Sequence, residues 1–212
     1  MYIPPHFLEV DEAVISGLVE HFPLATVVCH LGDEFVANHI PMLRTSDNTY
    51  VGHIAKENDL HQLFPDGMAA IAIFSAENAY ISPNWYPSKK DNHRHVPTWN
   101  YQVVHMHGRI TFDHARKTKL AVVGQLTKVY EQQYSGDEAW KLSDAPRDYM
   151  EAMLDNIVAF TFEVGTIVAK SKLSQNRAPR DFESVIESME ENGKPRLAQA
   201  MKTRVKDSYP DR

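Results

Sequence analysis

The sequence predicts a mainly β protein with peripheral helices, in which consecutive strands form an antiparallel barrel. Short segments rich in Val, Ile, Phe and Tyr follow one another in the first part of the chain, with turn residues between them. Connections this short join antiparallel neighbours. Helical patterns occur at the ends of the chain and once late in it, so strands and helices do not alternate as they do in a doubly wound sheet.

The predicted helices lie around this run of strands. Asp11 precedes a helical pattern over 11–22, in the position of an N-cap. A second helix is predicted at 115–130, and apolar residues at helical spacing over 182–189 predict a terminal helix, with a further one over 197–201. The predicted strands are 24–30, 34–43, 49–55, 68–75, 98–112 and 157–169.

Length and composition indicate one compact domain, with 212 residues of which 43% are apolar and 24% charged. The net charge of −6 and the pI near 6.0 are opposite to the basic surface of a domain that binds nucleic acid by itself. No run of residues approaches the length that crosses a bilayer, so we expect a cytoplasmic protein with no membrane segment. The one cysteine, Cys29, lies in an apolar run and is expected to be buried rather than reactive.

A bound phosphate would need side-chain partners, because the sequence has neither a GxGxxG nor a GxxxxGK[ST] motif. Two segments offer such partners. Residues 52–56 end a predicted strand with a histidine and a lysine, and residues 170–177 combine three cations with hydroxyl and amide donors. The second segment has little reason to pack in a core, so it is either an anion site or a solvated basic loop.

Aromatic residues flank a polar loop at 82–97, which is too long for a hairpin turn and of a kind that often carries function. The flanking segments, 80–87 and 96–101, are suited to hold a planar ring by stacking. Their aromatic side chains fit an ordinary core equally well.

Histidines raise the question of a metal or haem site. His105 and His107 share one face of a predicted strand, about 7 Å apart, and two more histidines lie in the preceding loop. The sequence has no HExxH motif, no cysteine partner and no ordered carboxylate spacing, so no dedicated metal site is predicted. A nucleophilic triad is not predicted either, because no serine stands in a GxSxG motif.

Seven ordered blocks, spread over nearly the whole chain, carry a resemblance to a known family. They are MYIP with HF at 1–7, VANHIP at 36–41, GHIAK at 52–56, YISP with WY at 80–86, VPTWNY at 96–101, VHMHG at 104–108 and KLSQNR at 172–177. Together they resemble the PaiB family of FMN-binding negative transcriptional regulators.

The resemblance implies an FMN-binding split β-barrel with C-terminal helices, related to the pyridoxamine-phosphate oxidase and flavin reductase barrels, in which two subunits share each flavin site. It implies a split-barrel domain at 1–178 and a helical appendage at 179–212 that packs on the same domain. The residues that it implies around the flavin are Asn38, His39, His53, Lys56, Trp85, Tyr86, Trp99, Asn100, Gln175, Asn176 and Arg177.

Regulation as a homodimer is the function that the resemblance favours, although the acidic chain gives no support to direct DNA binding. A flavin-dependent oxidoreductase of the NAD(P)H:flavin type is the alternative, because related barrels carry out redox chemistry, so whether the chain is an enzyme stays open. Haem or metal binding through His105 and His107 is the lower alternative.

Overall fold

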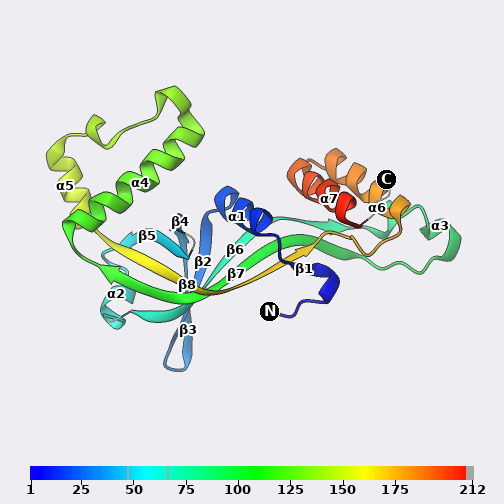
Figure 1. The fold of residues 1–212 in the computed structure, drawn as a ribbon, viewed down its shortest axis with the longest axis horizontal. Helices are drawn as coiled ribbons and strands as arrows, with labels where there is room; N and C mark the ends of the chain where they lie inside the picture. Colours follow the sequence, from blue (N-terminus) through cyan, green and yellow to red (C-terminus); the bar gives the residue numbers. More distant parts are fainter. Residues whose placement is uncertain (47, 66, 209–212) are drawn as a thin grey trace. The chain divides into compact units, whose positions relative to one another are not determined.

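The computed structural model describes residues 1–46, 48–65 and 67–208, with side chains described as far as residue 204 (Figure 1). The strands are β1 (Leu8–Glu9), β2 (Leu24–Leu31), β3 (Glu34–Pro41), β4 (Leu43–Ser46), β5 (Thr49–Ala55), β6 (Met68–Ile81), β7 (Thr98–Asp113) and β8 (Ile157–Lys172). The α-helices are α1 (Glu12–His21), α2 (Leu60–Leu63), α3 (Lys89–Asn92), α4 (Arg116–Ser135), α5 (Arg147–Asp155), α6 (Pro179–Glu191) and α7 (Pro195–Ser208). Short 3₁₀ turns are η1 (Pro5–Phe7), η2 (Pro83–Trp85), η3 (Gly136–Glu138) and η4 (Leu142–Asp144).

The strands form one sheet in the order β3-β2-β6-β7-β8-β5-β4, and β1 also pairs with β8. β2 pairs antiparallel with β3 and β6, and β5 pairs antiparallel with β4 and β8. Within the described residues the hydrogen-bonded path ends at β3 and β4, so the barrel is open between these two strands. The predicted mainly β class with peripheral helices is confirmed.

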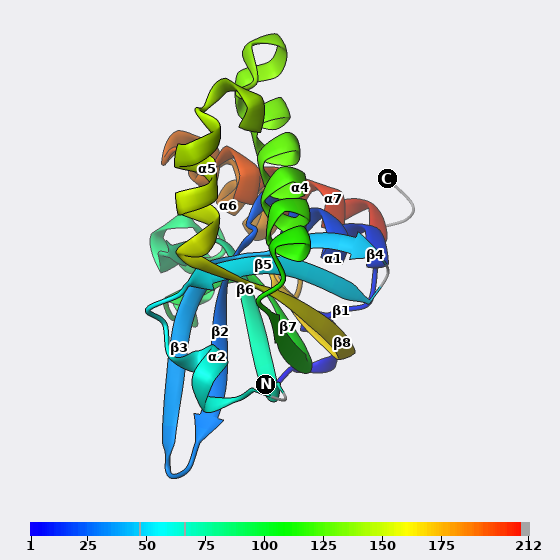
Figure 2. The ribbon, with the colours of Figure 1, turned by 90° about the vertical axis from the view of Figure 1, so that its left-hand side faces the viewer.

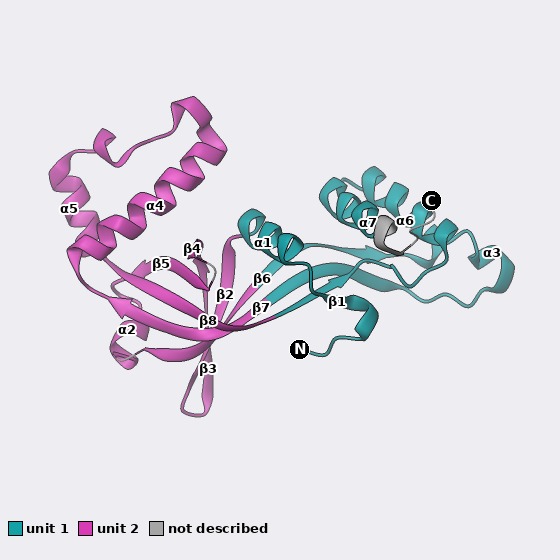
Figure 3. Ribbon diagram, viewed as in Figure 1, with its two compact units in different colours: residues 1–22, 74–104, 168–212 teal, residues 23–73, 105–167 magenta. Residues whose placement is uncertain are grey.

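The chain divides into two compact units, each of which receives residues from the three long strands β6, β7 and β8 (Figure 3). Unit 1 comprises residues 1–22, 74–104 and 168–212, and unit 2 comprises residues 23–73 and 105–167. No helix in the described part of the chain is long and apolar enough to span a membrane. The predicted appendage at 179–212 stays a prediction.

In unit 2, the predicted strand 34–43 is two strands that pair with different neighbours. β3 pairs with β2 as far as Pro41, and β4 pairs with β5 from Leu43 onward. Between them, Met42 is buried, and its N–H donates to the Pro23 carbonyl over 3.0 Å. This break brings β5 close to the end of β3, where a Cβ at Gly52 would lie 2.8 Å from the Pro41 carbonyl oxygen.

Helix α4 packs against β5 in unit 2 and is followed by α5 (Figure 2). Val122 and Leu126 of α4 form a small core with Ala159 of β8, against which Val51 of β5 also packs. The predicted helix 115–130 is therefore confirmed, whereas α5 and the single turn α2 were not predicted. Cys29 is buried as predicted, and burial raises the pKa of its thiol to about 11.

Unit 1 has a core in which α6 and α7 pack together with strand and loop residues. Its buried members are Ala79, Ile81, Tyr86, Leu173, Phe182, Val185, Ile186, Met189, Leu197, Ala198 and Met201. The apolar residues predicted over 182–189 and 197–201 are thus the buried stripes of two helices, as expected. The segment 170–177, predicted as an anion site or a solvated basic loop, starts inside a strand, because β8 continues to Lys172.

Candidate functional site

Unit 2 carries the first set of predicted flavin ligands at one end of β3 and β5. The Asn38 side chain accepts a 2.7 Å hydrogen bond from Asn58 Nδ2 at its Oδ1, which fixes the amide so that its N–H donors point elsewhere. Lys56 is exposed two residues before Asn58, just beyond the end of β5. Exposure alternates along β3, so His39 is exposed on the face opposite to Asn38. The structure thus brings Asn38 to the turn that carries Lys56, and His39 points away.

His53 lies on the face of β5 that α4 covers. It lies two residues after Val51 and therefore on the same face of the strand, and Val51 packs against the α4 residues Val122 and Leu126. Its Nδ1 is buried and has no hydrogen-bond partner among the described residues, and burial lowers the pKa of the imidazole, which is therefore neutral near pH 7. An unmatched buried ring nitrogen is a group that a ligand can satisfy.

Unit 1 carries the second set, which includes a buried tyrosine between two basic side chains. The Tyr86 ring is contacted by the Arg177 guanidinium at 4.9 Å and by the His95 ring at 5.0 Å, measured between ring centres for the latter. The Tyr86 hydroxyl is buried without a hydrogen-bond partner in the described structure. Trp85 is half-buried against the helical core of unit 1, so this neighbouring aromatic contributes to the fold as well.

A cavity of about 430 Å³ opens beside this tyrosine, between the polar loop and α6. Trp85 and Tyr86 line its aromatic side, and Lys89, Lys90 and His93 supply basic groups. The loop predicted to carry function therefore does border a cavity, although its middle is a helical turn, α3, rather than irregular chain.

Trp99 presents its ring at the surface of unit 1, with 52% of the residue exposed. Tyr80 meets it edge-on, with the ring centres 6.1 Å apart. Behind the ring, Lys172 donates from Nζ to the Trp99 carbonyl over 2.7 Å and to the Thr98 hydroxyl. Burial, reinforced by nearby cations, lowers the pKa of Lys172. Trp99 can therefore act as an exposed planar wall.

Asn100, by contrast, is fully buried in unit 1. Its Oδ1 accepts a 3.0 Å hydrogen bond from the Ser174 hydroxyl, and its Nδ2 lies 3.7 Å from the sulfur of Met201. These contacts hold the start of β7 against the end of β8 and α7.

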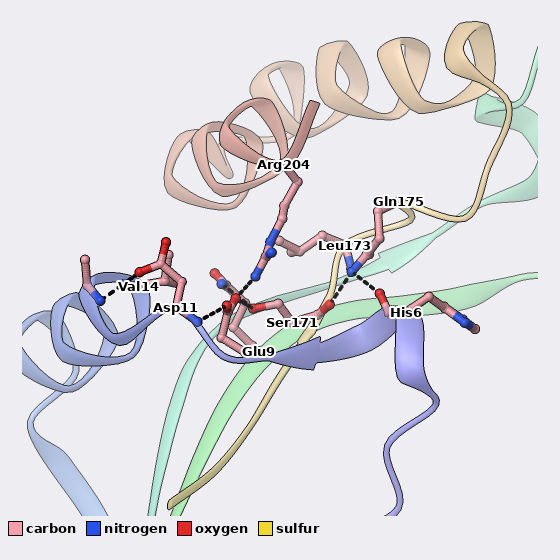
Figure 4. A network of polar contacts seen from close by, with 10 residues as sticks. His6, Glu9, Asp11, Val14, Ser171, Leu173, Gln175 and Arg204 are labelled. Carbon is pink, nitrogen blue, oxygen red and sulfur yellow. Dashed lines mark hydrogen bonds and ion pairs between the residues drawn. The ribbon is translucent and has the colours of Figure 1, made fainter. Parts of the chain in front are cut away.

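Gln175 also bonds within unit 1. Its Oε1 accepts from the Leu173 N–H over 2.7 Å, and its Nε2 donates to the carbonyls of His6 and Ser171 (Figure 4). The side chain thus ties the segment after β8 to the N-terminal segment. Asn176, the next residue, is exposed.

Unit 1 also contains a group of three interacting polar residues that the sequence did not predict. Ser88 in the polar loop donates to a carboxylate oxygen of Asp181 over 2.5 Å, and its Oγ lies 2.8 Å from His95 Nε2. Because the hydroxyl donates to Asp181, it accepts from His95, which is the reverse of the direction that activates a serine nucleophile. Burial opposes ionisation, but the Ser88 hydrogen bonds hold the pKa of Asp181 below its ordinary value. No local pattern links residues 93 positions apart.

The strand histidines have the placement that the sequence predicted. His105 and His107 both lie half-buried on β7, on one face. Burial is the main cause that lowers the pKa of His105. Within the residues that the structure describes, no group of three or more His, Cys, Asp or Glu side chains is placed to hold a metal ion.

Solved structures share this fold. The FAD and heme binding protein from Mycobacterium smegmatis aligns with a TM-score of 0.57 at 16% identity, over 78% of this chain and 73% of that chain. The flavocytochrome Anf3 from Azotobacter vinelandii aligns with a TM-score of 0.59 at 10% identity, over 80% of this chain and 72% of that chain. Identities this low show the fold alone, which is that of a split barrel.

Sequence comparison identifies the family. The family model described as "Putative FMN-binding domain" matches residues 1–166. "Protease synthase and sporulation protein PAI 2" of Bacillus subtilis (strain 168) is 33% identical over 214 residues, which cover 97% of this chain and 99% of that protein. "Uncharacterized protein YKL070W" of Saccharomyces cerevisiae is 32% identical over 130 residues, or 51% of this chain and 76% of that protein. The chain belongs to this PaiB-type family of FMN-binding domains, and FMN is its cofactor.

The groups found in each unit fit FMN. The cofactor has a planar ring with hydrogen-bond donors and acceptors and a phosphate with nearly two negative charges. Unit 2 offers the cation Lys56, the oriented amide of Asn38 and the unmatched nitrogen of His53. Unit 1 offers Arg177 and the exposed ring of Trp99. Charge-assisted bonds suit the phosphate, and aromatic faces suit the ring.

Proposed function

We propose that this FMN-binding chain acts as a PaiB-type negative transcriptional regulator and works as a homodimer in the cytoplasm. The observation that carries the proposal is the end-to-end similarity to PAI 2, at 33% identity over 97% of this chain. Similarity over nearly both whole chains supports a shared role better than a match over one module would.

For the cofactor, each unit is proposed to contribute its own contacts. In unit 2, these are Asn38, His53 and Lys56 and, from the opposite face of β3, His39. In unit 1, the accessible groups Trp85, Trp99, Asn176 and Arg177 are proposed to touch FMN, while Tyr86, Asn100 and Gln175 position them from behind. The burial of Tyr86 and Asn100 and the internal hydrogen bonds of Gln175 support the second role. The exposure of Trp99 and Asn176, and the partial exposure of Trp85 and Arg177, support the first. When bound, FMN supplies a ring that exchanges electrons, and the protein residues bind and orient it.

The net negative charge of the chain limits how it can contact DNA. With a net charge of −6, contact with DNA would have to come through a small basic patch or a partner protein. In the proposed homodimer, two-fold symmetry would present such a patch twice, as a site made of two half-sites requires.

Selection from a random duplex DNA library, followed by mobility shifts with and without FMN over a range of salt, tests this function. We expect one sequence to be retained at physiological salt and its affinity to change when FMN is added. If the chain binds all sequences equally and only at low salt, direct regulation is wrong. Turnover of NAD(P)H by the FMN-loaded protein would then favour the oxidoreductase.

Sedimentation with FMN present tests the homodimer. We expect a stable dimer at micromolar concentration, because a split barrel that shares flavin walls between subunits needs a closed two-fold interface. A monomer under these conditions would contradict the proposal.

A further inference from the structure

Unit 1 contains a second cavity, of about 480 Å³, whose residues have no part in the proposed flavin contacts. It lies between α1 and α7 over the strands β6 and β7. Its volume falls within the range of about 300–1,000 Å³ that is typical of small-molecule sites.

Each helix contributes apolar residues to the side walls of this cavity. Val14, Leu18 and Phe22 line it from α1 and the residue after that helix, and Leu197 and Ala200 line it from α7. These residues suit the hydrocarbon body of a ligand, whereas His21, Arg196, Gln199 and Thr203 add polar groups to the lining.

The polar end of the cavity, at Gln102 and Arg204, adjoins a network in which one carboxylate is fully matched. Glu9 is buried, its Oε1 accepts from the Asp11 N–H over 3.1 Å, and its Oε2 accepts from the Ser171 hydroxyl over 2.7 Å. The same Oε2 forms an ion pair with Arg204 (Figure 4). Ser171 in turn accepts from Gln102 Nε2 over 2.9 Å. The charge of Arg204 is therefore balanced by Glu9, whereas the second arginine of the lining, Arg196, lies with its guanidinium 6.0 Å from the Phe22 ring centre.

A second carboxylate in the cavity lacks such partners. Glu77 of β6 lines the cavity, and its Oε2 is buried with no hydrogen-bond partner among the residues that the structure describes. A buried carboxylate oxygen without a donor is costly, and in native structures the donor comes from the protein, an ordered water, an ion or a ligand.

We propose that this cavity binds a small molecule with an apolar body and a protonated amine head, whose N–H groups donate to Glu77. The amine matches both the charge and the missing donor, and the body occupies the space between the α1 and α7 walls. This site is separate from the flavin contacts and holds whether or not the chain regulates transcription.

Gly17 gives a way to close the cavity without breaking the fold. It lines the cavity from the middle of α1, and a Cβ built there meets no atom within 4 Å. Gly17→Leu should therefore fill the space, and because leucine is a better helix former than glycine, the variant should melt no lower than the parent.

Calorimetric titration of the full chain with 2-phenylethylamine tests the proposal, with 3-phenylpropionate as the probe of opposite charge. We expect saturable binding of the amine below about 1 mM and none of the carboxylate. Glu77→Gln should weaken the amine at least tenfold, and Gly17→Leu should abolish its binding. Glu12→Gln removes an exposed carboxylate from α1, the helix that carries Gly17, and should leave the affinity for the amine unchanged.

Three results would overturn this assignment. Equal binding of amine and carboxylate would show no role for the Glu77 charge, and undiminished binding by Gly17→Leu would place the amine elsewhere. Loss of FMN together with the amine in Glu77→Gln would make the cavity part of the flavin site. A parent protein that binds the amine but not FMN would contradict the proposed cofactor contacts and would leave the amine site supported.

Discussion

Arg177 is the residue at which phosphate recognition can be separated from a structural role. Its guanidinium lies 4.9 Å from the Tyr86 ring centre, so Arg177→Ala removes a cation–π contact that contributes about 0.5–2 kcal/mol to stability. If Arg177 also binds the phosphate, the substitution removes charge-assisted hydrogen bonds and weakens FMN by about 1.5–3 kcal/mol, or roughly 10- to 150-fold in Kd. Riboflavin lacks the phosphate and should lose little beyond the effect of the altered ring packing.

The assay is a flavin fluorescence titration with FMN and with riboflavin on each protein, because their affinity ratio cancels general damage to the site. Arg180→Ala is the matched control: that side chain is 56% exposed, lies three positions along the chain and forms a surface ion pair with Asp91. We expect the control to keep the ratio of the parent. An Arg177→Ala protein that is folded by its melting curve and still prefers FMN as strongly as the parent would refute the phosphate role.

Three further substitutions test separate parts of the structure. Trp99→Ala should weaken FMN by about 1 kcal/mol in the same titration and barely change the melting temperature, because the ring is exposed; unchanged affinity would remove it from the site. Gly52→Ala should lower the free energy of unfolding, measured in urea, by about 1–3 kcal/mol, because its Cβ would lie 2.4 Å from an aromatic ring carbon. Gly124→Ala, whose Cβ would have its nearest atom at 3.6 Å, should instead stabilise α4. Similar changes in the free energy of unfolding for both variants would contradict the predicted clash. Because the pKa of Asp181 is lowered in the fold, its hydrogen bond with Ser88 stabilises the protein above the ordinary carboxyl pKa, and this stability is lost as pH falls through the lowered pKa. The parent and Asp181→Asn should therefore differ in melting temperature at pH 7 and have converging melting temperatures in acid. A difference in melting temperature that stays constant with pH would refute this.

The strand pattern was predictable wherever one strand keeps one partner. The strand 49–55 was predicted with the observed bounds, because its alternating side chains lie against β8 along its whole length. The stretch 34–43 was predicted as one strand, since alternation continues through Met42. The change of partner from β2 to β5 at that residue is set by contacts with distant parts of the chain, which local alternation does not contain.

The segment 170–177 shows a similar limit for the candidate site. Its cations and hydroxyls indicated a segment with little reason to be buried, and that expectation was wrong for most of residues 170–174. Lys170 pairs with Leu8 of β1, while Ser171 and Ser174 are buried because Glu9 and Asn100 supply their hydrogen bonds. Polar residues become core residues when partners from elsewhere in the chain satisfy them, and the local sequence does not record those partners.

This difference also divides the predicted flavin residues into two kinds. Asn100 and Asn176 are the same residue type in neighbouring motifs, and both qualify as donors by sequence. The Asn100 side chain bonds to Ser174 and Met201 inside unit 1, whereas Asn176 and Trp99 face outward. A change at Asn100 should therefore lower stability before it alters flavin affinity, and a change at Trp99 should do the reverse. The motifs thus combine residues that build the end of β8 with residues that can touch the cofactor, and exposure and hydrogen bonding separate the two.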